Sequence, residues 1–151
     1  MIYKKISDIT ISMKSCDYLD LPECFVNEIP VYMNKKETEV YESFKADMVA
    51  SIEGEEVDAA NAAVLSNKLL QMANGCIYDE HKNALRIHDR KLDALEDLIE
   101  SANGKPLLIA YWFQHDLARI KERFTVREIK SSKDIEDWNK GKIPLAVIHP
   151  A

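Results

Sequence analysis

The chain has 151 residues, of which 46% are hydrophobic and 30% are charged, a length and composition that predict one globular domain. No apolar run approaches the about 20 residues that cross a bilayer, and residues 1–11 lack the features of a signal peptide, so we expect a cytoplasmic protein. The net charge of −6 lies in residues 1–75, and neither half has the basic excess of a protein that grips DNA alone.

The cysteine and histidine residues give no sign of a metal site. Cys16, Cys24 and Cys76 are odd in number and irregularly spaced, which favours free thiols in a reducing compartment. No Cys-x-x-Cys pair or Cys/His cluster offers zinc ligands, and the four histidines do not form a ligand set by their spacing. We therefore predict no metal ligand in this chain.

The N-terminal part of the chain is expected to lead into the domain and then form a strand. Residues 1–24 show no regular hydrophobic period, whereas residues 25–33 predict a strand. Because Pro30 cannot donate to a ladder, this strand should lie at a sheet edge. Its inward side would carry Phe25, Ile29, Val31 and Met33.

Three helices and a hairpin are expected next. Asn34 and Glu37 resemble a capping box, and apolar spacing through Ile52 predicts a helix that Gly54 ends. A second helix should span residues 58–74, with Gly75 as its C-terminal glycine. Residues 76–78 and 84–87 predict a hairpin. A third helix, closed by Asn103 and Gly104, should turn inward Leu92, Leu95, Leu98 and Ile99.

The rest of the chain alternates strands and helices. Residues 107–110 are wholly apolar, which is typical of a buried parallel strand. Further strands are expected at 125–129 and 145–148, with helices between them that contain Leu117 and Ile120, and Ile135 and Trp138. This alternation predicts an α/β fold: a three-layer parallel sheet with helices on both faces, preceded by the N-terminal strand and helical segment.

The motifs exclude an independent nucleotide site. The chain has no phosphate loop and no Gly-x-Gly-x-x-Gly, and its four glycines fall where helices should end. Tyr111, Trp112 and Phe113 follow the apolar strand, at the carboxyl end of the sheet, where ligands bind in open α/β folds. We expect Phe113 in the core and Tyr111 or Trp112 at a surface, where an aromatic ring could stack on a base.

Two polar groups leave structural and functional interpretations open. His115 and Asp116 follow the aromatic residues and could form an acid/base pair. The favoured interpretation is that they begin a helix, with the aspartate near the positive end of its dipole. Asp134, Glu136 and Asp137 are expected to form a solvated helix face.

Six sequence blocks carry a family resemblance. Residues 105–113 read Lys-Pro-Leu-Leu-Ile-Ala-Tyr-Trp-Phe and are similar to the strand of helicase motif IV. Residues 145–151 resemble the strand that enters motif V. The other blocks, in order, are 21–44, 68–75, 88–98 and 135–141. Together they resemble the second, RecA-like lobe of Swi/Snf-type DNA-dependent ATPases of helicase superfamily two, and the short spacing between Phe124 and Ser131 is most like compact phage and prophage members.

The resemblance implies a lead-in segment over residues 1–24 and a partial C-terminal helicase lobe over 25–151. The parent would bind ATP and Mg²⁺, mainly through an N-terminal helicase lobe, and would act on double-stranded DNA. This chain would contribute no catalytic residue and no metal ligand. The residues implied to contact nucleic acid are Tyr111, Trp112, Gln114, His115 and His149.

The sequence also departs from the family. The Ser-Gln of motif IV is Tyr111-Trp112 here, and the glycine-rich motif V loop and the motif VI arginines do not occur in the chain. We therefore expect an incomplete lobe without ATPase activity of its own. Its truncated sheet should leave an open edge or an uncovered apolar face beside residues 145–148, through which the chain could self-associate. The alternative is a non-catalytic α/β protein-interaction module.

Overall fold

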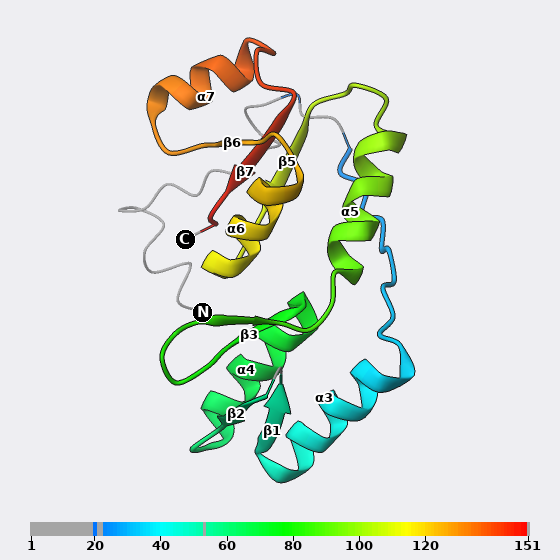
Figure 1. Ribbon diagram of the computed structural model, residues 1–151. Helices are drawn as coiled ribbons and strands as arrows, with labels where there is room; N and C mark the ends of the chain where they lie inside the picture. The colour runs from blue at the N-terminus through cyan, green and yellow to red at the C-terminus, as the bar shows by residue number, and fades with distance from the viewer. Residues whose placement is uncertain (1–19, 21–22, 53, 151) are drawn as a thin grey trace, which may run out of the picture.

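The computed structural model describes residues 20, 23–52 and 54–150, which form a mixed α/β structure (Figure 1). Among these residues, no helix is long and apolar enough to cross a membrane. The elements in chain order are α3 (Lys35–Asp47), β1 (Val49–Ile52), β2 (Glu55–Asp58), α4 (Ala62–Asn74), β3 (Cys76–Tyr78), β4 (Ala84–Arg86), α5 (Arg90–Ser101), β5 (Leu107–Ala110), α6 (Gln114–Arg123), β6 (Arg127–Glu128), α7 (Ser132–Asn139) and β7 (Leu145–Ile148).

A three-stranded parallel sheet forms the C-terminal half. Its order is β5-β7-β6, with Leu107 opposite Leu145 and Arg127 opposite Ala146. The prediction that three strands lie parallel in one sheet is therefore confirmed. β7 lies in the middle and is paired on both sides, so the prediction of an open edge beside residues 145–148 is wrong. The edges are β5 and β6, and self-association through an edge stays a prediction.

One face of this sheet packs on helices α5 and α6. The cluster between them contains Leu92, Tyr111, Leu117, Ile120 and Val147. The opposite face of β5 is open, because Leu108 is 50% exposed and Ala110 is exposed. The prediction that residues 107–110 form a buried strand is thus wrong for one face. Successive side chains of a strand alternate between the two faces, so Leu108 and Ala110 point away from the cluster that contains Ile109 and Tyr111.

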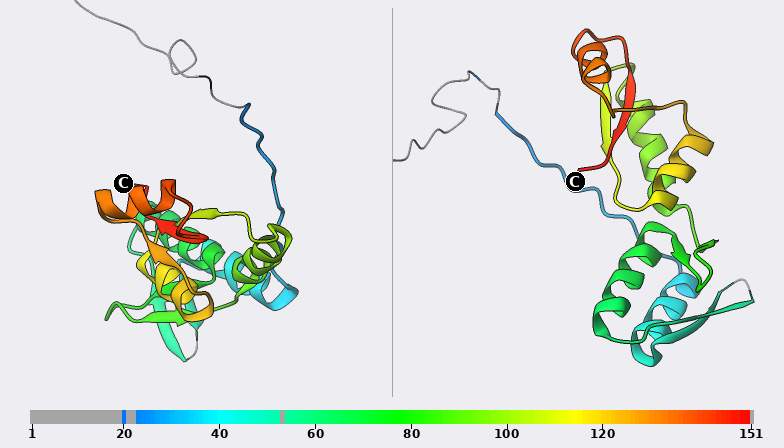
Figure 2. Two further views of the ribbon diagram at one scale, coloured as in Figure 1. Left: turned by 90° about the horizontal axis from the view of Figure 1, so that it is seen from above. Right: turned by 90° about the vertical axis from the view of Figure 1, so that its left-hand side faces the viewer.

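The N-terminal half has its own hydrophobic cluster. Helices α3 and α4 pack with two antiparallel hairpins, β1-β2 and β3-β4, around Phe44, Val57, Met72 and Ile77. Figure 2 shows this group on one side of the molecule and the parallel sheet on the other, joined by the connection from β4 to α5. The hairpin at residues 76–87 was predicted correctly, with Cys76 opposite Arg86.

The first helix begins as predicted but ends earlier. Asn34 and Glu37 form the capping box. The helix stops at Met48, whose φ of 59° is left-handed, and Val49–Ile52 then forms a strand paired with Glu55–Asp58. The prediction that Ile52 belongs to the helix is wrong, because alternate burial of β1 turns Ala50 and Ile52 into the core.

The second helix also starts later than predicted. Residue 58 pairs with Val49 in the hairpin, and α4 begins only after Asn61, whose side chain accepts hydrogen bonds from the N–H groups of Ala63 and Val64. Gly54 follows β1 in the hairpin turn and does not end a helix. The later helix boundary at Gly75 is as predicted, with a φ of 97°.

Residues 25–33 are extended but form no strand, so that prediction is wrong. Phe25, Val26 and Tyr32 are 78%, 83% and 79% exposed, and no ladder hydrogen bond involves the described residues of this segment. Strand-like composition predicts an extended backbone, but a strand exists only where a neighbour supplies hydrogen bonds. The predicted lead-in over residues 1–24 lies mostly outside the described residues.

Gly75 fixes how the two halves meet, and its substitution is the first test of the fold. A Cβ atom at Gly75 would lie 2.1 Å from the carbonyl oxygen of His88, whereas a Cβ at Gly141 would meet no atom within 4 Å. Both residues have positive φ, so both alanine variants carry the left-handed cost of about 1 kcal/mol. We expect Gly75→Ala to lower the free energy of unfolding by more than about 3 kcal/mol because of the added clash, and Gly141→Ala by about 1 kcal/mol. Urea unfolding measures both, and equal losses would contradict the close approach.

Candidate functional site

The carboxyl end of β5 brings together an aromatic group that the sequence singled out. Trp112 and His149 follow the adjacent strands β5 and β7. Their rings stack with centroids 6.0 Å apart and planes at 27°, and His149 Nε2 lies 3.3 Å from the carbonyl oxygen of Trp112. Tyr111 meets His149 edge-on at 5.3 Å. Trp112 is 59% exposed, so an indole face is available to a ligand here.

Tyr111 is the buried member of this aromatic group. It is 6% exposed, and its hydroxyl donates to Glu128 Oε1 at 3.0 Å. Glu128 also accepts from Lys121 Nζ at 2.7 Å. The Lys121 hydrogen bond outweighs burial, and with those from Lys130 and Tyr111 it lowers the Glu128 pKa to about 2. Of the two aromatic residues left open by the sequence, Trp112 is at the surface and Tyr111 is in the core.

The other two predicted contact residues are consecutive at the start of α6 and differ in exposure. Gln114 is exposed. His115 is 4% exposed, and its ring lies against Tyr78 and Phe113, each with a centroid distance of 5.1 Å. Its backbone N–H donates to the Tyr78 hydroxyl at 3.0 Å. The structure therefore places the His115 side chain at the junction with the β3-β4 hairpin and not with Trp112.

Asp116 has the contacts of a helix-capping residue. Its Oδ2 accepts from the Phe113 N–H and from Asn74 Nδ2, both at 3.0 Å, and its Oδ1 lies 3.0 Å from His115 Nδ1. Burial raises the Asp116 pKa, but hydrogen bonds from His115, Phe113 and Asn74 together lower it below its ordinary value. These contacts favour the helix-start interpretation over an acid/base pair, because the carboxylate is already occupied and the imidazole is enclosed.

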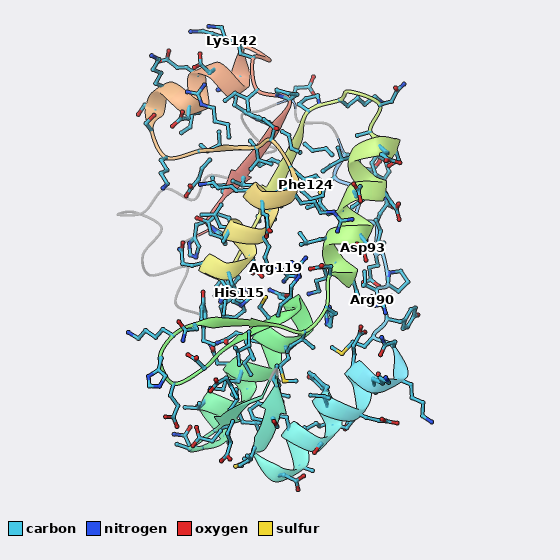
Figure 3. The ribbon with its side chains drawn as sticks, in the orientation of Figure 1. Arg90, Asp93, His115, Arg119, Phe124 and Lys142 are labelled. Carbon is cyan, nitrogen blue, oxygen red and sulfur yellow. The ribbon has the colours of Figure 1, made fainter. Side chains whose placement is uncertain are left out.

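Arg119 is a central residue that sequence reasoning missed. It is 8% exposed, and Figure 3 shows it reaching from α6 toward the N-terminal half. Its guanidinium donates to the carbonyl oxygens of Asn74 at 2.7 Å and His88 at 2.6 Å, and to Asp89 Oδ1 at 2.6 Å. The signal that could have found it is its place between Leu117 and Ile120, on the inward side of an amphipathic helix, where a cation needs partners.

A pocket of about 450 Å³ opens beside Trp112. Most of its lining is apolar and comes from α5 and the end of β5. Its polar end carries Lys91, Asn74, Asp116 and Arg119, and Lys91 Nζ donates to Asn74 Oδ1 at 2.6 Å. The remaining wall is the extended N-terminal segment, through Ile29 and Val31. The two cations are already engaged, Lys91 by Asn74 and Arg119 by the Asn74 and His88 carbonyl groups and Asp89. The pocket therefore suits an apolar group better than a phosphate.

The residues of this chain do not fit the ATP and Mg²⁺ that the resemblance implies for its parent. The glycines occupy a hairpin turn and the ends of helices, so none forms a phosphate-binding loop before a helix. Among the described residues, no three His, Cys, Asp or Glu side chains gather into a group that could hold a metal ion.

Comparison with known proteins gives one informative relative. The chain is 36% identical over 149 residues to a protein called p41 from Acyrthosiphon pisum secondary endosymbiont phage 1, and the match covers 97% of the chain and 32% of p41. The chain thus spans about a third of the length of this relative. No family model matches the chain, and no solved structure matches it. The relative supports a phage context.

His88, whose carbonyl oxygen accepts from Arg119, predicts a pH dependence of stability. Its ring is buried, and neither ring nitrogen has a hydrogen-bond partner in the described structure. Burial lowers the His88 pKa; Glu37 opposes this effect, and Arg119 and Arg90 add to it. The unfolded chain therefore binds the proton at higher pH, so stability is present above the ordinary histidine pKa of about 6.5 and is lost as pH falls below it.

We expect the free energy of unfolding to decline from pH 7 to pH 5.5, and His88→Phe to make this decline shallower. His81→Phe, at an exposed histidine, is the matched control and should keep the wild-type slope. Urea unfolding at each pH gives the slopes, and parallel slopes for His88→Phe and the wild type would contradict the assignment to His88.

Proposed function

We propose that this chain is part of the second lobe of a Swi/Snf-type DNA-dependent ATPase of phage or prophage origin, with a RecA-like arrangement. In such a machine, ATP and Mg²⁺ are bound mainly by an N-terminal helicase lobe, and both lobes close on double-stranded DNA in the cytoplasm. The chain described here would be a scaffold that holds one DNA-facing edge and would not hydrolyse ATP alone.

Three observations support the proposal. The sequence blocks at 105–113 and 145–151 fall on β5 and β7 and on the residues after them, and these two strands are parallel neighbours, as strands of one α/β lobe would be. The block at 135–141 falls on α7 and its end. A phage protein three times as long is similar over nearly the whole chain, which leaves room for further lobes in a longer polypeptide.

The observation that carries the proposal is the position of Trp112. It lies at the carboxyl edge of the parallel sheet, stacked on His149 from the neighbouring strand and 59% exposed. Ligands of open α/β sheets bind at this edge, and exposed aromatic rings stack on bases or lie along a nucleic-acid backbone. Gln114 is exposed beside it. Of the five residues implied by the family, Trp112, Gln114 and His149 are therefore the ones proposed to meet DNA, with Tyr111 positioning them.

The proposal predicts that the purified chain has no ATPase activity. The phosphate loop and the motif VI arginines are missing from its sequence, so nothing can cradle the phosphates or stabilise charge on the transferred phosphoryl group. We expect phosphate release no faster than the blank, with or without duplex DNA. Activity that co-purifies with the chain through two unrelated chromatographic steps would show that this expectation is wrong.

The proposal also predicts weak DNA binding that is sensed by one tryptophan. With a net charge of −6 and no permanent cation among Trp112, Gln114 and His149, counterion release contributes little. The dissociation constant for a short duplex at physiological salt should be weaker than the about 10⁻⁴–10⁻⁶ M of typical non-specific binders. Fluorescence anisotropy measures it, and sub-micromolar binding would contradict the charge argument.

The two tryptophans make the contact testable by position. The Trp138→Phe variant keeps only Trp112, and the Trp112→Phe variant keeps only Trp138, which lies on α7. At high DNA concentration we expect quenching in the first variant and none in the second. Quenching in both, or in Trp112→Phe alone, would remove the carboxyl edge of β5 from the proposed DNA contact.

A second candidate is a non-catalytic protein-interaction module. The observation that favours it is the run of large exposed side chains in the extended segment, where Phe25, Val26 and Tyr32 are all more than three-quarters exposed. Such a surface suits a protein partner better than a phosphate backbone. If DNA quenched the fluorescence of neither tryptophan, the protein-interaction module would be the better supported function.

A further inference from the structure

Residues 25–33 and the outer edge of β5 each lack a strand to pair with. Residues 25–33 are extended and apolar, and their described backbone makes no ladder hydrogen bond. Strand β5 is the edge of the parallel sheet, where Leu108 is 50% exposed. An extended segment without a sheet and a sheet edge without a strand each leave backbone groups to water, and edges of this kind invite an additional strand.

The unpaired groups of β5 can be identified from its bonds to β7. The N–H groups of Leu107 and Tyr111 donate to Pro144 and Ile148 at 2.9 and 3.1 Å. Because N–H groups alternate sides along a strand, those of Leu108 and Ala110 point away from β7. They are the donors that an added strand would meet.

The segment already lies across a groove from this edge. Ile29 and Val31 line the 450 Å³ pocket together with Ile109 and Ala110 of β5. The floor includes Leu98, which is 39% exposed. Figure 1 shows the segment passing beside α5, the helix that leads into β5. The groove is therefore a gap between two surfaces of the same chain, and it is lined mainly by apolar side chains.

We propose that residues 25–33 form a strap that closes onto the open edge of β5 as a fourth strand, and that the structure described here is its open form. Closure would fill the groove with Ile29 and Val31 and would cover Leu98 and the edge beside Leu108. It would also narrow access to Ala110 and Trp112, so the strap would regulate the aromatic surface at the carboxyl end of the sheet. This inference does not depend on the ligand of that surface.

Pro30 fixes the register of the closed strap. A proline fits an edge strand only where its missing N–H faces solvent. If Pro30 faces outward, then the N–H groups of Ile29 and Val31 face β5. A proline at position 31 would remove a donor that closure needs, whereas a proline at position 32 would again face outward and would be tolerated.

Amide hydrogen exchange measured by NMR on the full chain tests the strap. We expect the amides of Leu108 and Ala110 to exchange at least about tenfold more slowly than free peptide amides in the wild type and in Tyr32→Pro, and to lose this protection in Val31→Pro. The amides of Ala146 and Val147, in the central strand, report whether each variant is folded. Both substitutions lie outside every helix and strand, so the fold should survive them.

Each other outcome overturns the proposal. Fast exchange of Leu108 and Ala110 in the wild type would mean that the edge stays open. Protection that persists in Val31→Pro would mean that another group covers the edge. Protection that rises with protein concentration would assign the contact to a second copy of the chain and not to a strap within one molecule.

Discussion

The guanidinium of Arg119 is the interaction on which the arrangement of the molecule depends. It comes from α6, in the parallel-sheet half, and bonds the carbonyl oxygens of Asn74 and His88, which end α4 and precede α5. Its third partner, Asp89, also pairs with Arg86. Burial raises the Asp89 pKa, but hydrogen bonds from Arg86 and Arg119 lower it below its ordinary value. A buried cation is stable only when partners of opposite charge or polarity surround it. The two terminal nitrogens of Arg119 have three such partners, so this side chain joins the two hydrophobic clusters in one orientation.

This junction explains why Gly75 and His88 are so tightly placed. The carbonyl oxygen of Gly75 accepts from the N–H groups of Ile87 and His88 at 2.8 and 3.2 Å, which draws the end of β4 against the end of α4. Any side chain at Gly75 would separate the two carbonyl groups that Arg119 bridges. The polar contacts of Asn74 with Lys91 and Asp116 extend the same network toward the pocket. The chain around Trp112 is therefore positioned by β5 before it and by the hydrogen bonds of Asp116 with Phe113 and Asn74 after it.

Much of this architecture follows from local sequence signals, and the failures have identifiable physical causes. The capping box at Asn34 and the glycine at position 75 were predictable because each depends on nearby residues. The parallel strands were predictable from the regular alternation of short apolar runs with helices. The strand at 25–33 was wrongly predicted because pairing depends on a distant neighbour. Arg119 was missed because a single arginine has no pattern, and its role arises only when Asn74 and Asp89 are brought to it. Within the candidate site, the sequence predicted that these residues follow β5 at the carboxyl end of the sheet, but it could not separate the surface-facing Trp112 from the enclosed His115.

The strand order has a consequence for how the chain acquires its structure during synthesis. β5 and β6 do not pair with each other in the sheet, and each is paired with β7. β7 is the last of the three strands to leave the ribosome. The α/β half therefore cannot complete its sheet until residues 145–148 have emerged, whereas the two hairpins and helices of the N-terminal half close through contacts nearer in sequence. In the interval the apolar residues of β5 are without a partner strand.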